Sequence, residues 1–300
     1  MSSNSTWDQN ANLFQNSPYI YFPTEWVCAT LLSLFALSTL IHVGQAIYFR
    51  IWWLFPTAVV AGILEVLGWT GRTWSSLNAK PFTPYLMQIT TTIIAPTPLV
   101  AANFIILGQV ITRLGPRYSR LSARWYTILF VSCDIVALVV QAIGGAAASN
   151  AVNQHKDPGP GGNIMLGGIV FQLAAIVVYV ALALEFLLRY TRNQPIHDRN
   201  LVLERRRRTD IRMKLMLLGM CLMTIFIFIR SVYRTIELAG GWTGRIIQTQ
   251  VLFNVLDGAM ICLAMYTLNI LHPGLLLQKT SLDRGDDTPV ESKQAEKAEP

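Results

Sequence analysis

The sequence predicts an all-α polytopic membrane protein with seven transmembrane helices, an N-terminus outside the cell and a cytoplasmic C-terminus. The chain has 300 residues, of which 52% are hydrophobic and only 14% charged, whereas soluble domains carry about 25% charged residues. Seven apolar segments reach the roughly 20 residues that a helix needs to cross the hydrocarbon core. Basic residues are concentrated in alternate connections between these segments.

The predicted membrane domain covers residues 26–275, with a polar external tail at 1–25 and a disordered cytoplasmic tail at 276–300. Helices are expected because the alternating pattern of a membrane β-barrel is absent and lipid cannot satisfy open backbone groups. The first 25 residues lack the basic start of a cleavable signal peptide, so the first helix is expected to direct insertion. The helices are expected at about 26–49, 52–74, 85–110, 125–148, 164–188, 214–237 and 248–271.

The distribution of basic residues sets the orientation. Eighteen of the 24 lysines and arginines fall on one side, which the positive-inside rule assigns to the cytoplasm. The net charge of +7 therefore reflects topology, and no nucleic-acid partner is expected. The run Arg205, Arg206, Arg207 and Arg208 lies beside the sixth helix, where contact with anionic lipid is favoured over a nuclear-localisation or RNA-binding role. Asn4 begins an Asn-Ser-Thr sequon in the external tail, where a glycan could be added.

Polar side chains inside the apolar segments indicate where a functional site lies, because ionisable groups at membrane depth are costly and face a protein-lined or hydrated interior. Glu65 and Arg72 are seven residues apart on the second helix, so they share one face. Asp134 and Gln141 repeat this spacing on the fourth helix, and Gln172 lies on the fifth. Arg72 and Gln141 are expected near the outer end of the bundle, with the other three nearer mid-span.

The third and fourth segments contain features that disturb or tighten helix packing. Pro96 and Pro98 interrupt the third segment. Proline in a helix interior removes a backbone donor and leaves a carbonyl group in need of another partner, so a simple kink and a gating hinge are both compatible. In the fourth segment, Gly144 and Gly145 open a run of small residues, which allows helix backbones to approach closely.

Two polar triplets face each other across a short glycine-rich turn between the sixth and seventh helices. They follow the same i, i+4, i+7 spacing and consist of Arg230, Arg234 and Glu237, then Gln250, Asn254 and Asp257. Each triplet is therefore expected on one helical stripe. The short turn makes the two helices antiparallel neighbours.

Two interpretations of these polar residues stay open. They can form an interhelical salt-bridge network that only fixes helix register. Alternatively, they line a hydrated pocket open toward the outer leaflet, in which arginines attract an anionic or zwitterionic headgroup and apolar walls take a hydrocarbon tail. The pocket residues predicted in that case are Glu65, Arg72, Asp134, Gln141, Gln172, Arg230, Arg234, Glu237, Asn254 and Asp257.

Short motifs contain most of these polar residues. They are Glu65-x-x-Gly68-Trp69-x-x-Arg72, Asp134 with Gln141 and Gly144-Gly145, Gly168-x-x-x-Gln172, Arg230-x-x-Tyr233-Arg234-x-x-Glu237, Asp257 and His272-Pro273-Gly274. In these motifs the chain resembles the fungal RTA-like family of seven-helix membrane proteins, also called lipid-translocating exporters. The resemblance implies a plasma-membrane protein that handles amphiphiles, such as toxic lipids, sterol analogues, sphingoid long-chain bases or porphyrins. Gln250 and Asn254 depart from the family pattern, which usually has an acidic residue and a tyrosine there.

The first function considered is a transporter or translocator of a sphingoid base, phospholipid or sterol-like toxic lipid. No G-x-x-x-x-G-K-[ST] loop is present, so movement would be downhill, powered by another protein, or proton-coupled through a carboxylate such as Asp257 or Glu65. The alternative is a seven-helix receptor or lipid-stress sensor without transport activity. D-R-Y-like and N-P-x-x-Y-like motifs, however, are absent.

An intramembrane enzyme is not expected, and neither catalytic residues nor a cofactor are predicted. The four histidines lie outside the polar residues described above and lack H-x-x-x-H spacing, so no metal site is expected. The four cysteines also lack metal-binding spacing. The predicted partners are membrane lipids and an amphiphilic substrate, and a homo-oligomer or a regulatory membrane partner stays compatible with the sequence.

Overall fold

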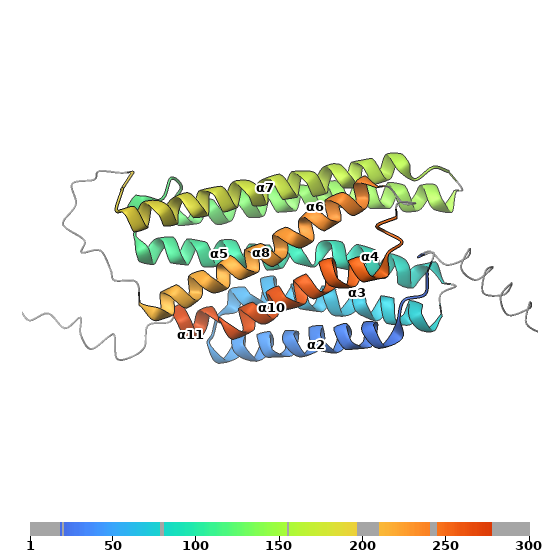
Figure 1. The fold of residues 1–300 in the computed structure, drawn as a ribbon, viewed down its shortest axis with the longest axis horizontal. Helices are drawn as coiled ribbons and strands as arrows, with labels where there is room; N and C mark the ends of the chain where they lie inside the picture. Colours follow the sequence, from blue (N-terminus) through green and yellow to red (C-terminus); the bar gives the residue numbers. More distant parts are fainter. Residues whose placement is uncertain are drawn as a thin grey trace, which may run out of the picture.

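The computed structural model describes residues 19, 21–78, 81–154, 156–196, 210–240 and 245–277. All regular structure in this part of the chain is helical, and seven helical stretches are long and apolar enough to cross a membrane. The prediction of seven spanning helices is confirmed, and Figure 1 shows them side by side along the long axis. Asn4 and the run Arg205–Arg208 lie outside the described residues, so their glycosylation and lipid contact stay predictions.

The seven spans are built from α-helices, with short 3-10 and π segments labelled η. The first three are α2 (Glu25–Tyr48), α3 (Val60–Leu77) preceded by η1 (Trp52–Leu54) and η2 (Phe55–Val59), and the pair α4 (Phe82–Ile94) and α5 (Pro96–Leu114). The next three are α6 (Ala123–Asn153), which follows η3 (Pro116–Tyr118), α7 (Gly159–Arg192) and α8 (Ile211–Ala239). The seventh consists of α9 (Gln250–Phe253), η4 (Asn254–Ala259), α10 (Met260–Ile270) and α11 (Pro273–Leu277).

The third span is broken at Ala95, as the sequence predicts, because Pro96 has no backbone N–H to continue the hydrogen-bonded ladder. The α4 helix ends with the N–H of Ala95 donating to the carbonyl of Thr91 at 2.9 Å. Pro96 would be the next residue to donate, to the carbonyl of Thr92. That carbonyl is therefore available to a donor from another helix.

The seventh span departs from the regular helix that was expected. Residues 254–259 form a π turn, in which the hydrogen bonds close a wider ring than in an α-helix. Gln250 and Asp257 consequently contact different elements. The hydroxyl of Thr24 donates to Oε1 of Gln250 at 3.2 Å, whereas Asp257 accepts hydrogen bonds from α8. The expected single stripe of Gln250, Asn254 and Asp257 is thus corrected.

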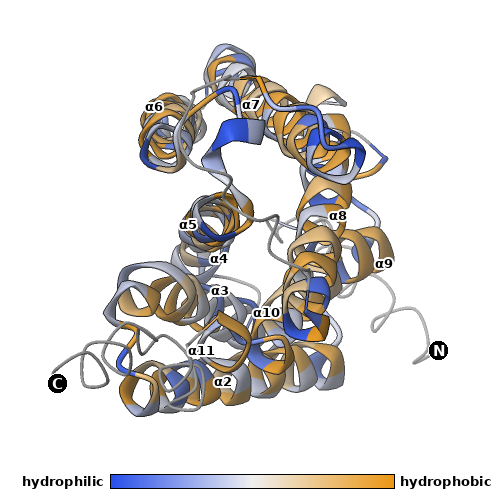
Figure 2. Ribbon diagram, turned by 90° about the vertical axis from the view of Figure 1, so that its left-hand side faces the viewer, coloured by the Kyte–Doolittle hydropathy of each residue, from blue (hydrophilic) through white to orange (hydrophobic). Residues whose placement is uncertain are grey.

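The helices form a bundle in which α6 and α7 lie at one side, α2 and α10 at the other, and α5 between them (Figure 2). Glycines allow α6 and α7 to pack closely. A Cβ atom at Gly168 would lie 2.9 Å from the carbonyl oxygen of Ala137, and one at Gly144 would meet the backbone of Met165. The close backbone approach predicted from the small residues of the fourth segment is confirmed.

Many large apolar side chains lie on the outer surface of the bundle, and orange predominates along the spanning helices in Figure 2. Leu40 is 69% exposed and Ile270 is 73% exposed. Apolar side chains exposed on this scale mark a surface that contacts lipid or another apolar partner. Together with the seven spans, this exterior is that of a multi-pass membrane protein.

Candidate functional site

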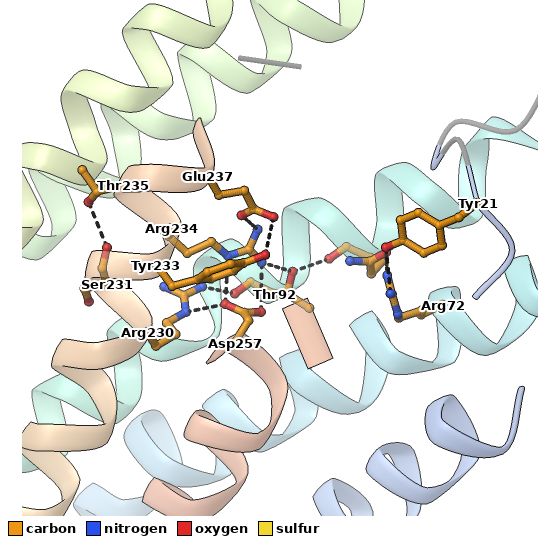
Figure 3. Close-up of polar contacts among 11 residues, drawn as sticks. Tyr21, Arg72, Thr92, Arg230, Ser231, Tyr233, Arg234, Thr235, Glu237 and Asp257 are labelled. Carbon is orange, nitrogen blue, oxygen red and sulfur yellow. Dashed lines mark hydrogen bonds and ion pairs between the residues drawn. The ribbon is translucent and has the colours of Figure 1, made fainter. Parts of the chain in front are cut away.

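A cluster of buried charges joins α8 to the seventh span (Figure 3). Nε of Arg230 donates to Oδ1 of Asp257 at 2.9 Å, and Nε of Arg234 donates to the same oxygen at 2.8 Å. Nη1 of Arg234 donates to Oε2 of Glu237 at 2.9 Å, and the hydroxyl of Tyr233 donates to its Oε1, also at 2.9 Å. All five side chains are buried. Two cations and two carboxylates therefore compensate each other away from water.

Thr92 attaches this cluster to the proline break of the third span. Nη2 of Arg230 donates to the backbone carbonyl of Thr92 at 2.7 Å, and Nη2 of Arg234 donates to its hydroxyl at 3.2 Å. In a regular helix the N–H four residues later would take that carbonyl, but residue 96 is proline. Arg230 replaces the missing donor, which confirms the expectation that a proline-freed carbonyl needs another partner.

Arg72 on α3 is held apart from the cluster. Its side chain is 1% exposed, its Nη2 donates to the hydroxyl of Tyr21 at 2.9 Å, and its Nη1 donates to Oε1 of Gln88 at 3.3 Å. Its guanidinium lies 4.4 Å from the ring centre of Phe253, a cation–π contact. Arg72 has no carboxylate partner among the described residues. It is thus a buried cation that no ion pair balances there.

Tyr19, which precedes the first helix, is fixed against α4 beside Arg72. Its hydroxyl donates to Oε1 of Gln88 at 2.6 Å. Burial raises the pKa of Tyr19 to about 12, so the phenol keeps its proton at neutral pH and remains a donor. The Oε1 atom of Gln88 therefore accepts from both Tyr19 and Arg72, which ties three segments of the chain together.

A cavity of about 490 Å³ lies between α4, α6 and α8, toward the end of the bundle where α6 joins α7. Its charged and polar wall contains Arg72, Gln141, Arg234 and Glu237. The rest of the wall is mostly apolar and includes Leu86, Ile89, Ile93, Leu138, Met165 and Leu238. Apolar walls with a few convergent polar groups are typical of small-molecule sites.

The structure separates the ten predicted pocket residues by depth. Four line the cavity, namely Arg72, Gln141, Arg234 and Glu237. Behind this wall, Arg230 and Asp257 contact each other, Glu65 is buried near both, and Gln172 accepts a hydrogen bond from Gln141 at 3.0 Å.

The remaining two, Asp134 and Asn254, lie outside these contacts. Within the described residues, the buried Asp134 has no hydrogen-bond partner for either carboxylate oxygen. The half-buried Asn254 likewise leaves its Oδ1 atom without one there. For the part of the chain that the structure describes, no hydrogen bond explains why the Asp134 carboxylate or Oδ1 of Asn254 lies inside the bundle.

Three residues of the site were not predicted from the sequence. Thr92 could have been found, because it stands four residues before Pro96 and its carbonyl must be freed. Gln88 is a polar residue inside an apolar segment, which is the same signal that identified Gln141. Tyr19 lies in a polar stretch and carries no such signal.

Sequence comparison adds an independent line of evidence. The family described as RTA1 like protein matches residues 58–280. The chain belongs to the RTA1-like family. This result confirms the family expected from the motifs, and the matched region contains every charged residue of the cavity wall. Within the described residues of this RTA1-like protein, no three His, Cys, Asp or Glu side chains are grouped as metal ligands.

Several yeast proteins are similar to this RTA1-like chain. The sphingoid long-chain base transporter RSB1 of Saccharomyces cerevisiae is 31% identical over 276 residues, which cover 84% of this chain and 72% of that protein. Protoporphyrin uptake protein 1 of the same species is 28% identical over 211 residues, 69% of this chain and 65% of its own length. Protein RTM1, also from that yeast, is 27% identical over 203 residues, which cover 67% of this chain and 62% of that protein. No solved structure matches.

Proposed function

We propose that this RTA1-like protein translocates a lipid or similar amphiphile across the plasma membrane, with a sphingoid base, a phospholipid or a sterol-like toxic lipid as cargo. The observation that carries the proposal is the cavity of about 490 Å³ with one charged wall and one apolar wall. A relative at 31% identity is named a sphingoid long-chain base transporter, which supports lipid as the class of cargo. The cargo leaves chemically unchanged, so no enzymatic step is included.

The two walls would bind different parts of an amphiphile. Arg72 is the cation of the wall that no carboxylate neutralises among the described residues, so it would attract a phosphate or carboxylate group. Glu237, whose carboxylate is shared with Arg234, would face a cationic group of a zwitterionic headgroup. Ile93, Leu138 and the other apolar side chains would contact the hydrocarbon tail.

The cavity is proposed to open toward the outer leaflet. It lies near the connection between α6 and α7, whereas four arginines lie in or directly beside the connection at the other end of α6, namely Arg113, Arg117, Arg120 and Arg124. The positive-inside rule assigns that basic connection to the cytoplasm. This orientation leaves the N-terminus outside and the C-terminus inside.

Reconstitution in liposomes tests the proposal. The full chain should accelerate leaflet exchange of a fluorescent long-chain base or phospholipid above the rate in empty vesicles. Leu138→Trp should slow the exchange because it fills the cavity, while Val139→Trp should not, since Val139 is 53% exposed on the outer surface of the same helix. If exchange equals that of empty vesicles under pH gradients of either sign, the translocator proposal fails. The receptor or lipid-sensor alternative would then be favoured.

A further inference from the structure

Asp134 differs from the other buried carboxylates whose contacts are described above. It is 1% exposed, and neither of its oxygens has a hydrogen-bond partner in the part of the chain that the structure describes. By contrast, Asp257 accepts from two arginines, and Glu237 accepts from Arg234 and Tyr233. Glu65 lies near the charges of Arg230 and Arg234. A charged group buried without such compensation is very costly. The charge of Asp134 is therefore not stabilised by hydrogen bonds from the described residues, unlike the charges of Asp257 and Glu237.

The position of Asp134 connects it to the cavity. Leu138 and Gln141 follow it by four and seven residues on α6, and both line the cavity. Residues with this spacing share one face of a helix. Because an α-helix rises about 1.5 Å per residue, Asp134 lies roughly 6 Å below Leu138 along the helix axis. It is therefore one turn beneath the cavity floor, toward the middle of the bundle.

The helices packed around this level of α6 supply polar groups without charge. On α7, Gln172 stands one turn below Gly168, which packs against Ala137 and Gln141 of α6, so Gln172 is level with Asp134. Nε2 of Gln172 donates to the hydroxyl of Thr97 on α5 at 3.2 Å, and Oε1 accepts from Gln141. This hydrogen-bonded chain links the cavity wall to the level of Asp134.

Among the described residues, Cys133 precedes Asp134 on α6, and a titratable tyrosine lies below it. The α7 helix contributes Tyr179, which closes the space below Asp134 in an aromatic layer with Phe104 and Phe130, at ring-centre distances of 4.7 and 5.6 Å. The α4 helix contributes Tyr85, which lies on the cavity wall well above this level, twelve residues before Thr97. The α5 helix contributes Thr97, which does not titrate. None of the ion pairs among the described residues includes Asp134, so no ion pair holds its carboxylate in the charged form there.

We propose that Asp134 is a proton-binding site that couples lipid movement through the cavity to a pH gradient. The inference rests on the proposed translocator function. One carboxylate oxygen takes a proton from a hydronium ion in the cavity water, so an O–H bond of hydronium breaks, a neutral water molecule is left and a neutral carboxyl group forms. On release, the carboxyl O–H bond breaks and a water molecule accepts the proton. The role falls to Asp134 and not to Asp257, because the charge of Asp257 is already compensated by two arginines.

The test uses the full chain in liposomes and a fluorescent lipid whose charge is independent of pH, such as phosphatidylcholine or a quaternary-ammonium analogue of a long-chain base. For one proton per lipid, a difference of one pH unit should shift the final leaflet distribution by up to about tenfold. Asp134→Asn should abolish this shift, whereas Asp134→Glu, which keeps a carboxyl group, should retain it. Glu185→Gln is the matched control, since Glu185 pairs with Arg120 and Arg189 away from the cavity. It should retain the shift.

The outcomes separate the two proposals. If neither lipid exchanges faster than in empty vesicles, both the translocator function and the proton site fail. If the wild type exchanges lipid without responding to the gradient, or if Asp134→Asn still responds, only the proton site fails. Should Asp134→Asn not fold, infrared titration of the wild type and Asp134→Glu decides. A pH-dependent carboxyl band must move in the Glu variant, and its failure to move overturns the assignment.

Discussion

Arg234 and Asp257 are joined by two hydrogen bonds, from Nε to Oδ1 at 2.8 Å and from Nη2 to Oδ2 at 3.0 Å. Oδ1 also accepts from Arg230, so a single carboxylate compensates two guanidinium groups from the preceding span. Both Arg234 and Asp257 are 3% exposed. The carboxylate therefore serves mainly as an anchor that fixes the charged wall of the cavity, since it does not itself line that cavity.

The first prediction is that Asp257→Asn destabilises the bundle strongly. The substitution leaves two buried arginines with one carboxylate, and breaking a buried ion pair by removing one partner costs about 3–5 kcal/mol. Glu185→Gln is the control, because its pair with Arg120 is more exposed and should contribute much less to stability. Unfolding in detergent measures both. Equal stability losses in the two variants would contradict the anchoring role.

Asp134 and Asp257 show which features of the site could be predicted from the sequence and which could not. Both are aspartates inside apolar segments, and the sequence predicts that both are buried near other polar groups. The structure gives Asp257 two arginines and Asp134 none among the described residues, because α6 packs mainly on α5 and α7 while η4 packs on α8. Which helices become neighbours is not a local property of the chain. The difference in partners between Asp134 and Asp257 could therefore not be predicted from the sequence.

The spans themselves were predictable because length and apolarity are local. The break at Pro96 was also predictable, since it follows from the covalent structure of proline. The π turn at residues 254–259 was not, because nothing local to Asn254 or Asp257 excludes a regular helix. The contacts of Asp257 with α8 and of Gln250 with Thr24 together favour the wider turn. The position of Tyr19 was not predictable either, since its hydroxyl bonds Gln88 of α4, which is distant in sequence.

The second prediction is that Arg72→Gln weakens binding of an amphiphile with a phosphate or carboxylate headgroup. A hydrogen bond to a charged group contributes about 1.5–3 kcal/mol, so affinity should fall roughly ten- to hundredfold. Binding of a neutral amphiphile with the same tail should change little, and Arg72→Lys should retain part of the affinity. Fluorescence titration in detergent measures all three. An equal loss for charged and neutral amphiphiles would instead assign Arg72 to packing against Phe253.

The third prediction concerns two adjacent glycines on α7. Gly168→Ala should destabilise the protein by about 1–3 kcal/mol, because overpacking of a close helix contact has that cost, and the added Cβ would lie 2.9 Å from the carbonyl oxygen of Ala137. Gly167→Ala adds the same methyl group where no atom lies within 4 Å. It should leave stability unchanged or raise it by up to about 1 kcal/mol through helix propensity. Thermal unfolding of the pair measures the difference, and similar midpoints would contradict the packing described for α6 and α7.

The fourth prediction is an energetic coupling between Arg230 and Pro96, which do not need to touch. Pro96→Ala restores a backbone N–H that competes for the carbonyl of Thr92, which now accepts from Arg230 at 2.7 Å. Arg230→Met should therefore cost less in the Pro96→Ala background than in the wild type, with a coupling of about 0.5–3 kcal/mol. A double-mutant cycle of unfolding free energies measures it. The same cycle with Pro98→Ala is the control, since that proline frees the carbonyl of Ile94 and not that of Thr92. Additive costs in the Pro96 cycle would show that Arg230 does not replace the missing donor.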